Sequence, residues 1–114
     1  MQAIFVELAS FRRYRAAYLD DDTYWLLQQI LMLHPEAGAG NTRPGGLRKV
    51  RFVDERRGKG KRGGLRVIYY WWSGGRQFWL FTLYDKDEAS DLTLGQRKTL
   101  KTLLKAELKA RSDT

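Results

Sequence analysis

The sequence predicts an α+β fold with a small antiparallel or mixed β-sheet, two helices from the N-terminal half and one C-terminal helix. Three observations lead to this class. Two segments near the N-terminus have helical spacing, three runs of strand-forming residues lie between residues 47 and 84, and leucines recur at helical spacing near the end. With a short apolar run at the start, the expected order is β-α-α-β-β-β-α. At 114 residues, the chain is expected to form one domain, residues 1–114.

The first two predicted elements are a short strand and a helix. Residues 3–8, AIFVEL, form an apolar run rich in strand formers. Ser10 is positioned to cap a helix that extends to about Leu19, because a serine hydroxyl accepts a hydrogen bond from the first turn. Aromatic residues recur along this helix at helical spacing: Phe11, Tyr14 and Tyr18.

A second helix is predicted after the acidic triplet Asp20–Asp22. The triplet supplies a turn and an N-cap, and its negative charge lies at the positive end of the helix dipole. The run YWLLQQILML follows, His34 is interpreted as a residue at the helix C-terminus, and Pro35 ends the helix. Three aliphatic residues share one stripe: Leu26, Ile30 and Leu33.

A meander of three strands is predicted at residues 47–53, 65–72 and 76–84. Ser73–Gly75 connects the last two strands, and its Gly-Gly pair favours a primed hairpin turn. Side chains alternate between the two faces of a strand. Alternation along the first strand therefore places Lys49 and Arg51 on one face and Arg48 on the other.

The last helix is predicted to run from Thr93 to about Ala110. Thr93 and Gln96 have the spacing of a capping box, in which each side chain bonds the backbone N–H of the other residue. The apolar stripe comprises Leu100, Leu103, Leu104 and Leu108. The lysines of this helix are interpreted as a solvated face: Lys98, Lys101, Lys105 and Lys109.

The positive charge of the chain is concentrated in one segment. The formal net charge is +8. Ten cations and two acids fall between Arg43 and Arg66, and the other eleven cations and eleven acids cancel. A charge placed for solubility would be spread along the chain, so this concentration indicates a polyanionic partner, and nucleic acid is the natural one.

Three cations of the predicted meander are the candidates for chemistry: Lys49, Arg51 and Arg66. If the first two strands pair as a hairpin, these side chains can share one face and converge on a phosphate group. Tyr70 and Trp72 fall on the Arg66 face, where unstacked bases could lie on their rings. The residues predicted to contact RNA or the ribosome are Arg48, Arg56, Arg57, Lys59, Lys61, Arg62 and Tyr70.

The residue types exclude or disfavour several kinds of site. The chain has no cysteine, which excludes disulfides and thiolate chemistry and agrees with a cytoplasmic location. A single histidine, His34, excludes a two-histidine ribonuclease mechanism. No metal or other cofactor is expected. The acidic residues that cluster after the last predicted strand do not have the spacing of a calcium-binding loop: Asp85, Asp87, Glu88 and Asp91. No secretory signal or membrane-spanning run is expected from the apolar pattern.

Four segments carry a family resemblance: FVELASFRRYRAAYLDDDTYWLLQQILMLHP, PGGLRKVRF, GKGKRGGLRVIYYW and LYDKDEASDLT. They span nearly the whole chain, and the central pair is the most specific. In these segments the chain resembles the RelE/HigB superfamily of toxins from type II toxin–antitoxin systems, and within it the HigB-like branch. The expected element order matches the compact α+β fold of that family, which is similar to that of microbial ribonucleases.

The resemblance implies an mRNA interferase, a metal-independent endoribonuclease that cuts mRNA in the A site of the 30S subunit. Translation would be inhibited and growth arrested. The ribose 2′-OH would attack the adjacent phosphate, giving a cyclic phosphate and a free 5′-OH. The resemblance also implies a cognate antitoxin, often with a helix-turn-helix domain, through which alone operator DNA would be bound. No cofactor and no membrane partner are implied.

By position, the resemblance assigns roles to four cations. Lys49 and Arg51 match the family's basic pair on the meander strand, one as general base and the other as orienter of the phosphate. Arg66 matches the arginine that stabilises the pentacoordinate transition state, where developing charge makes a cation most effective. Lys86 matches the lysine that follows the last strand.

The chain departs from the family pattern at two site positions. Asp87 stands where RelE has an arginine, and Thr93 stands where it has a late tyrosine. The proton donor is therefore left open among Tyr84, Tyr70 and a loop lysine. Two other functions also stay open: a non-catalytic RNA- or ribosome-binding module, and an inactive toxin homologue that binds an antitoxin.

Overall fold

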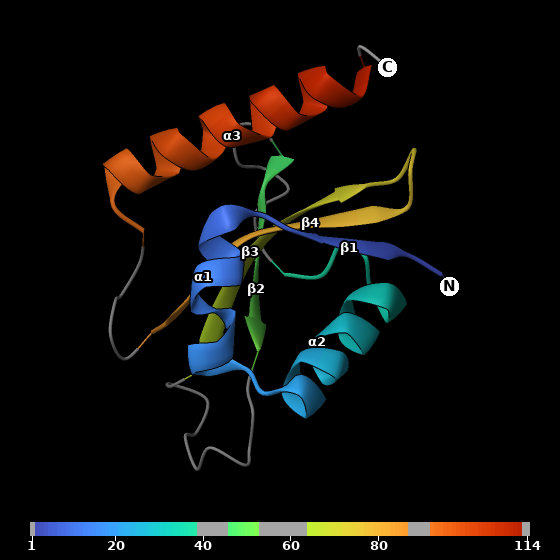
Figure 1. Ribbon diagram of the computed structural model, residues 1–114, viewed down its shortest axis with the longest axis vertical. Coiled ribbons are helices and arrows are strands. Elements are labelled where there is room, and N and C mark those ends of the chain that lie inside the picture. The colour runs from blue at the N-terminus through green and yellow to red at the C-terminus, as the bar shows by residue number, and fades with distance from the viewer. Residues whose placement is uncertain (1, 39–45, 53–63, 87–91, 113–114) are drawn as a thin grey trace.

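The computed structural model describes residues 2–38, 46–52, 64–86 and 92–112. Its elements are β1 Ile4–Glu7, α1 Ala9–Tyr18, α2 Asp21–Leu33, β2 Arg48–Phe52, β3 Leu65–Trp72, β4 Gln77–Asp85 and α3 Leu94–Ser112. The predicted α+β class and the predicted order β-α-α-β-β-β-α are confirmed. Figure 1 shows the elements and their connections.

The four strands form one mixed sheet in the order β1-β4-β3-β2. As the predicted meander requires, β2, β3 and β4 are antiparallel neighbours, whereas β1 pairs with β4 in parallel. β1 and β2 therefore lie at opposite edges, and α1 and α2 carry the chain from one edge to the other. The pairing of β3 with β4 shifts register between Ile68 and Tyr69.

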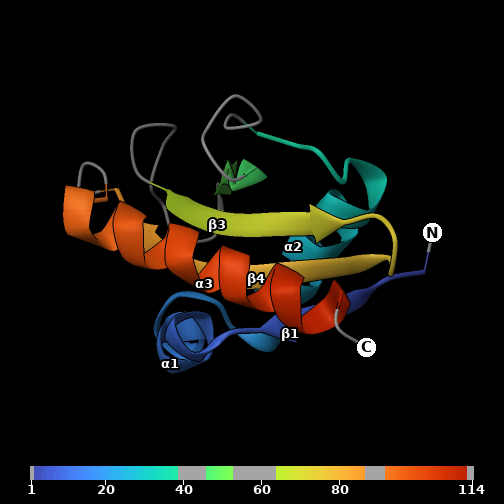
Figure 2. The ribbon, with the colours of Figure 1, turned by 90° about the horizontal axis from the view of Figure 1, so that it is seen from above.

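Helices cover both faces of the sheet, and Figure 2 shows α3 in front of it and α2 behind it. On the α1–α2 side the core includes Phe11, Leu19, Leu27, Leu31, Val67, Tyr69 and Phe78. On the α3 side it includes Ile68, Trp79, Phe81, Leu100 and Leu104. Successive side chains of β3 enter alternate cores, which explains why this strand is an almost unbroken apolar run in the sequence.

The hairpin between β3 and β4 differs from the predicted primed turn. The N–H of Gly75 donates to the Trp72 carbonyl and that of Arg76 to the Ser73 carbonyl, both at 3.3 Å, so two overlapping turns make the connection. The positive φ, 52°, falls at Arg76 and not at a glycine of the turn. Gly75 instead meets a steric need, because a Cβ there would collide with the Trp72 ring.

The start of α1 also corrects a prediction. Its N-cap is Leu8, which makes no side-chain capping hydrogen bond. Ser10 lies one residue inside the helix, and its hydroxyl is hydrogen bonded to Thr82 Oγ1 at 2.8 Å. Ser10 is therefore not the cap, because its side chain is used to tie α1 to β4.

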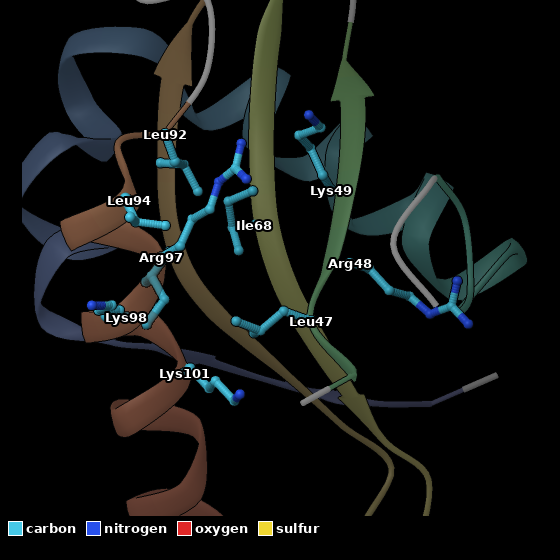
Figure 3. A pocket seen from close by; sticks show the side chains of 10 residues that line it. Leu47, Arg48, Lys49, Ile68, Leu92, Leu94, Arg97, Lys98 and Lys101 are labelled. Carbon is cyan, nitrogen blue, oxygen red and sulfur yellow. The ribbon is translucent and has the colours of Figure 1, made fainter. Parts of the chain in front are cut away.

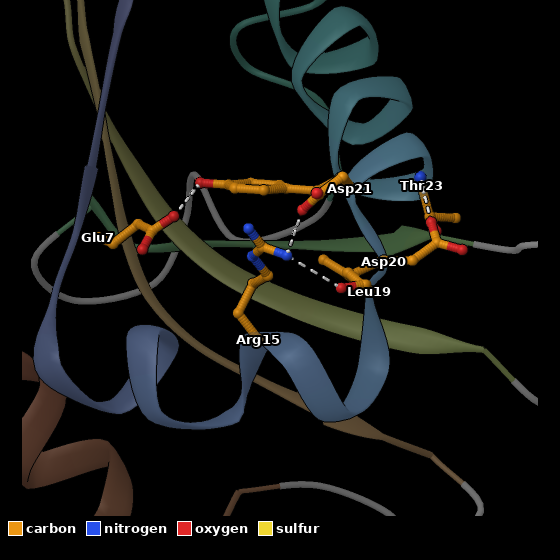
Figure 4. Close-up of polar contacts among 7 residues, drawn as sticks. Glu7, Arg15, Leu19, Asp20, Asp21 and Thr23 are labelled. Atoms are coloured by element: carbon orange, nitrogen blue, oxygen red, sulfur yellow. Dashed lines mark hydrogen bonds and ion pairs between the residues drawn. The ribbon is translucent and has the colours of Figure 1, made fainter.

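Polar contacts hold the corner between α1 and α2 (Figure 4). Asp20 caps α2 as predicted, its carboxylate accepting a hydrogen bond from the Thr23 backbone N–H at 2.7 Å. Arg15 donates to the Leu19 carbonyl at 3.3 Å and forms an ion pair with Asp21 at 3.1 Å. The acidic triplet thus serves both the turn and the helix start.

The aliphatic stripe predicted on α2 is exposed to solvent rather than buried. Its exposed fractions are 43% for Leu26, 39% for Ile30 and 74% for Leu33. The side that packs on the sheet carries Tyr24, Leu27 and Leu31. The end of the helix is as predicted, since the last residue is Leu33 and the C-cap is His34, whose N–H donates to the Ile30 carbonyl at 2.9 Å.

α3 begins with the predicted capping box. The Thr93 N–H donates to Gln96 Oε1 at 2.8 Å, and the Gln96 N–H donates to Thr93 Oγ1 at 3.1 Å. Leu100 and Leu104 are buried against the sheet, whereas Leu103 is 42% exposed and lies outside the packed stripe. In the described ranges of the chain, no helix is long and apolar enough to cross a membrane.

Candidate nucleic-acid interface

A row of three polar side chains crosses the sheet on the face that α3 covers. Arg51 of β2 lies directly opposite Arg66 of β3, and Arg66 lies directly opposite Tyr84 of β4. Residues directly opposite each other in antiparallel strands have Cβ atoms about 5 Å apart. Two guanidinium groups and a phenol therefore start from neighbouring points on one face.

Lys49 lies on the same face, two residues before Arg51 along β2. It is opposite Ile68, which belongs to the α3-side core, so it is a diagonal neighbour of Arg66. Diagonal neighbours in a sheet are about 7–8 Å apart, which a lysine side chain can span. We call Lys49, Arg51 and Arg66 the strand cations. Three positive charges at this spacing are stabilised when an anion binds between them.

The guanidinium of Arg66 is held in place by burial. The residue is 8% exposed, and its Nη1 donates to the Gly64 carbonyl at 3.4 Å. The same carbonyl accepts a hydrogen bond from the Lys86 backbone N–H at 3.1 Å, so Lys86 follows the end of β4 close to the start of β3. Lys86 and Arg51 are exposed, and Lys49 is half-buried. The site thus combines one fixed cation with others that reach solvent.

The structure places two of the predicted RNA contacts on opposite faces of the sheet. Tyr70 lies on the Arg66 face as predicted, half-buried, with its ring centroid 5.3 Å from that of Trp79. Arg48 lies on the other face of β2, where it donates to the Glu36 carbonyl at 2.8 Å and pairs with the Glu36 carboxylate at 3.4 Å. Arg48 is therefore not grouped with the strand cations.

The remaining predicted contacts lie outside the described residues: Arg56, Arg57, Lys59, Lys61 and Arg62. The same is true of Asp87, Glu88 and Asp91 in the acidic cluster, whereas Asp85 is fully buried. Among the residues that the structure describes, no group of three or more His, Cys, Asp or Glu side chains could hold a metal ion.

A groove of about 300 Å³ opens beside Lys49, between β2, β3 and α3 (Figure 3). We call it the β2–α3 groove. Its apolar lining is aliphatic: Leu47, Ile68, Leu92, Leu94 and Leu100. Its basic lining comes from both walls: Lys49 from β2, and Arg97, Lys98 and Lys101 from α3. Arg48 also borders the groove, although its guanidinium is paired with Glu36. No acidic side chain is among these ten residues.

The contribution of α3 to this groove was not predicted from the sequence. Its four lysines are exposed, as the solvated-face interpretation expects, and Lys98 and Lys101 also line the groove together with Arg97. Helical spacing could have indicated this contribution, because Arg97 lies three residues before the buried Leu100 and Lys101 lies three residues before the buried Leu104. Both exposed side chains therefore border the stripe that packs on the sheet.

No known family model matches the chain. The candidate site consequently depends on what the fold brings together. Strands β2, β3 and β4 contribute the row of Arg51, Arg66 and Tyr84, and α3 adds cations from a segment about thirty residues further along the chain than Arg66. Residues distant in sequence thus form one basic face with an aliphatic groove beside it.

Proposed function

We propose that the protein is an endoribonuclease toxin of the RelE/HigB type, which cleaves mRNA in the ribosomal A site and inhibits translation. The observation that carries the proposal is the direct pairing of Arg51 with Arg66 on adjacent strands, with Lys49 diagonal to them. Strands hold side chains more firmly than loops do. Arg51 and Arg66 are like charges directly opposite each other, which lowers the stability of a sheet, and a bound phosphate group would compensate for that loss.

In the proposed reaction the strand cations surround the phosphate between two nucleotides. The Lys49 amine, in its unprotonated form, accepts the proton of the 2′-OH, and Arg51, whose guanidinium keeps its charge, orients the phosphate. The 2′ oxygen forms a bond to phosphorus as the bond to the 5′ oxygen breaks, leaving a cyclic phosphate and a 5′-OH. Arg66 neutralises the negative charge that accumulates on the non-bridging oxygens, and its burial makes that interaction stronger than it would be in water.

The leaving 5′ oxygen needs a proton, and Tyr84 is the best-placed donor among the candidates. It lies directly opposite Arg66, and its ring is packed against the α3-side core. Tyr70 projects from β3 four residues beyond Arg66, and its ring rests on Trp79. Lys86 is exposed at the Arg66 end of the sheet and adds a further positive charge for the RNA backbone.

The proposed partners follow from this function. They are mRNA on the 30S subunit and a cognate antitoxin with a helix-turn-helix domain, through which operator DNA would be contacted. The proposed location is the cytoplasm, where translating ribosomes are found. The reaction as written uses only side chains and the RNA itself, with no metal or cofactor.

Substitution of Arg66 tests the proposal. Arg66→Ala is expected to lower mRNA cleavage on translating ribosomes by about 10²–10⁴-fold, the usual range for a catalytic group. Mapping of mRNA 5′ ends after brief expression measures it, with growth as a second readout. Arg13→Ala, an exposed arginine of α1, is the matched control and should cleave normally. An Arg66→Ala protein with full cleavage activity would contradict the assignment.

A non-catalytic RNA-binding module is the second candidate. It is favoured by the lack of a second histidine in the chain, since paired histidines are a common source of acid–base catalysis on RNA. In that case RNA would stay intact, and alanine substitutions of Lys49, Arg51 and Arg66 would weaken binding by similar, additive steps. The mapping experiment separates the two functions, because only the enzyme creates new 5′ ends.

A further inference from the structure

The β2–α3 groove has a composition that the proposed reaction at the strand cations does not require. Phosphate binding needs cations, yet half of the groove lining is aliphatic. Leu94 is 69% exposed although it borders this hollow. Exposed aliphatic side chains beside a basic rim favour a ligand that has both an apolar surface and negative charge.

The basic side chains of the groove are not equivalent. In Figure 3, Arg97 extends from α3 toward the side of the groove on which Ile68 and Lys49 lie, and the Lys101 amine points toward the strands. The Lys98 amine points away from the strands, and Arg48 extends toward its partner Glu36. Arg97 and Lys101 are therefore the α3 cations that face a ligand in the groove.

The size of the groove limits what can occupy it. A volume of about 300 Å³ is at the lower end of the range for small-molecule sites, which is about 300–1,000 Å³. It suits one planar ring system but not the apolar face of a helix, which spans several turns. Nucleobases have large apolar faces, and they stack on arginine guanidinium planes and insert between apolar side chains.

We propose that the β2–α3 groove binds the base of a single unstacked RNA nucleotide, with Arg97 stacked on the base and Lys101 on a flanking phosphate. Lys49 belongs both to the strand cations and to the groove lining, so the bound base is that of a nucleotide next to the cleaved phosphate. That last step rests on the proposed function. The binding of a base by the groove does not depend on cleavage.

An uncleavable probe tests the groove directly. A fluorescein-labelled 2′-O-methyl RNA hexamer would be titrated with the full chain, and its affinity measured by fluorescence anisotropy. The hexamer would then be resynthesised with one abasic residue at each position in turn. One abasic position is expected to weaken binding about tenfold, as the loss of one stacked base does. Equal affinity for all abasic hexamers would overturn the proposal.

Matched pairs of variants on α3 locate the effect. Leu94→Ala is expected to weaken binding about threefold and to reduce the loss caused by the abasic residue, whereas Leu103→Ala, exposed but absent from the groove lining, should change neither. Lys101→Ala should lower the salt dependence of log affinity by about 0.7, the value for one phosphate contact on a single strand. Lys105→Ala removes the same charge outside the groove and should leave the salt dependence unchanged.

The outcomes separate this inference from the proposed function. In one outcome, the protein cleaves mRNA normally while its Leu94→Ala and Lys101→Ala variants bind the hexamer like their controls. That result would overturn base binding by the groove and leave the endonuclease proposal intact. Abasic-sensitive binding by a protein that cleaves nothing would retain the groove and overturn the endonuclease. In a further outcome, the hexamer does not bind at low salt, or polyglutamate displaces it while abasic residues have no effect on its affinity. Either result would overturn base binding by the groove and favour an acidic peptide as its ligand.

Discussion

Arg66 is charged, almost fully buried and directly opposite another arginine. Charged side chains are seldom buried to this degree, and like charges directly opposite each other in a sheet destabilise it. Its guanidinium donates to the neutral carbonyl of Gly64. Removing this charge should therefore improve folding and harm function, which is the pattern expected of a binding site and not of a structural ion pair.

Arg66→Met is expected to raise the free energy of unfolding at low salt by about 0.5–1 kcal/mol, because it removes the repulsion from Arg51 and keeps an apolar side chain in the core. Urea denaturation measures the change, which should shrink at high salt. Arg48→Met is the matched control on β2 and should lower stability, since it breaks the contacts with Glu36. A large loss of stability in Arg66→Met would show that the arginine is structural.

Two buried tyrosines make stability sensitive to alkali. Burial raises the pKa of Tyr24 far above its usual value near 10, and the hydrogen bond that its hydroxyl donates to Glu7 at 2.7 Å raises it further (Figure 4). Burial likewise raises the pKa of Tyr69, whose hydroxyl donates to the Pro35 and Ala37 carbonyls. Both phenols therefore stay neutral in the folded chain when an unfolded chain would ionise them.

The resulting stability is complete below pH 10 and is lost as the pH rises above it, because the unfolded state then releases two protons that the folded state retains. We expect the melting temperature to fall steeply above pH 10. Absorbance at 295 nm should show late ionisation of these two tyrosines, coincident with unfolding. Tyr69→Phe should reduce the alkaline slope of the melting temperature, whereas Tyr14→Phe, 44% exposed, should leave it unchanged.

The sequence predicts the shared face of the strand cations because side-chain alternation is a geometric property of any strand. It could not place Tyr84 opposite Arg66, because cross-strand register depends on loop length and on the shift between Ile68 and Tyr69. It also could not show that Arg48 pairs with Glu36, since that contact joins two segments through the fold. The face on which a strand side chain lies can be predicted from the sequence, whereas its cross-strand partner can be identified only when the register is known.

At the scale of elements, local capping was predictable only where no tertiary contact competes. Thr93 and Gln96 are exposed, so their side chains are available to bond the backbone at the start of α3. Ser10 is packed near β4, and its hydroxyl bonds Thr82 instead. The orientation of α2 could not be predicted for a related reason. The helix is apolar on more than one side, so periodicity does not say which side the sheet covers.

Thr93→Ala is expected to lower the free energy of unfolding by about 1 kcal/mol, because it leaves a backbone N–H of the first turn of α3 without its acceptor. A double-mutant cycle with Gln96→Ala, measured by urea denaturation, should give a coupling energy, since the two side chains bond reciprocally. Thr99→Ala on the same helix is the control. Its hydroxyl donates to the Gly95 carbonyl within the helix, so stability should be unchanged or slightly raised. Additive losses would contradict the capping box.

At the scale of the whole molecule, the sheet separates two surfaces with different properties. α3 and the strand cations lie on one side, and α1 and α2 lie on the other. The exposed aliphatic stripe of α2 and the exposed arginines of α1 are thus remote from the candidate site. Because substitutions on one side do not touch the other, the two sides can be altered independently, and each provides controls for the other.

This separation predicts a one-sided salt dependence for RNA binding. Each phosphate contact on a single strand contributes about 0.7 to the slope of log affinity against log salt concentration. Lys49→Ala and Arg51→Ala should therefore each lower the slope for the uncleavable hexamer by about that amount. Arg12→Ala and Arg13→Ala remove the same charge from the exposed surface of α1 and should leave the slope unchanged. If the variants on both sides of the sheet lowered the slope equally, RNA binding would depend on net charge alone. That result would contradict a defined interface on the α3 side.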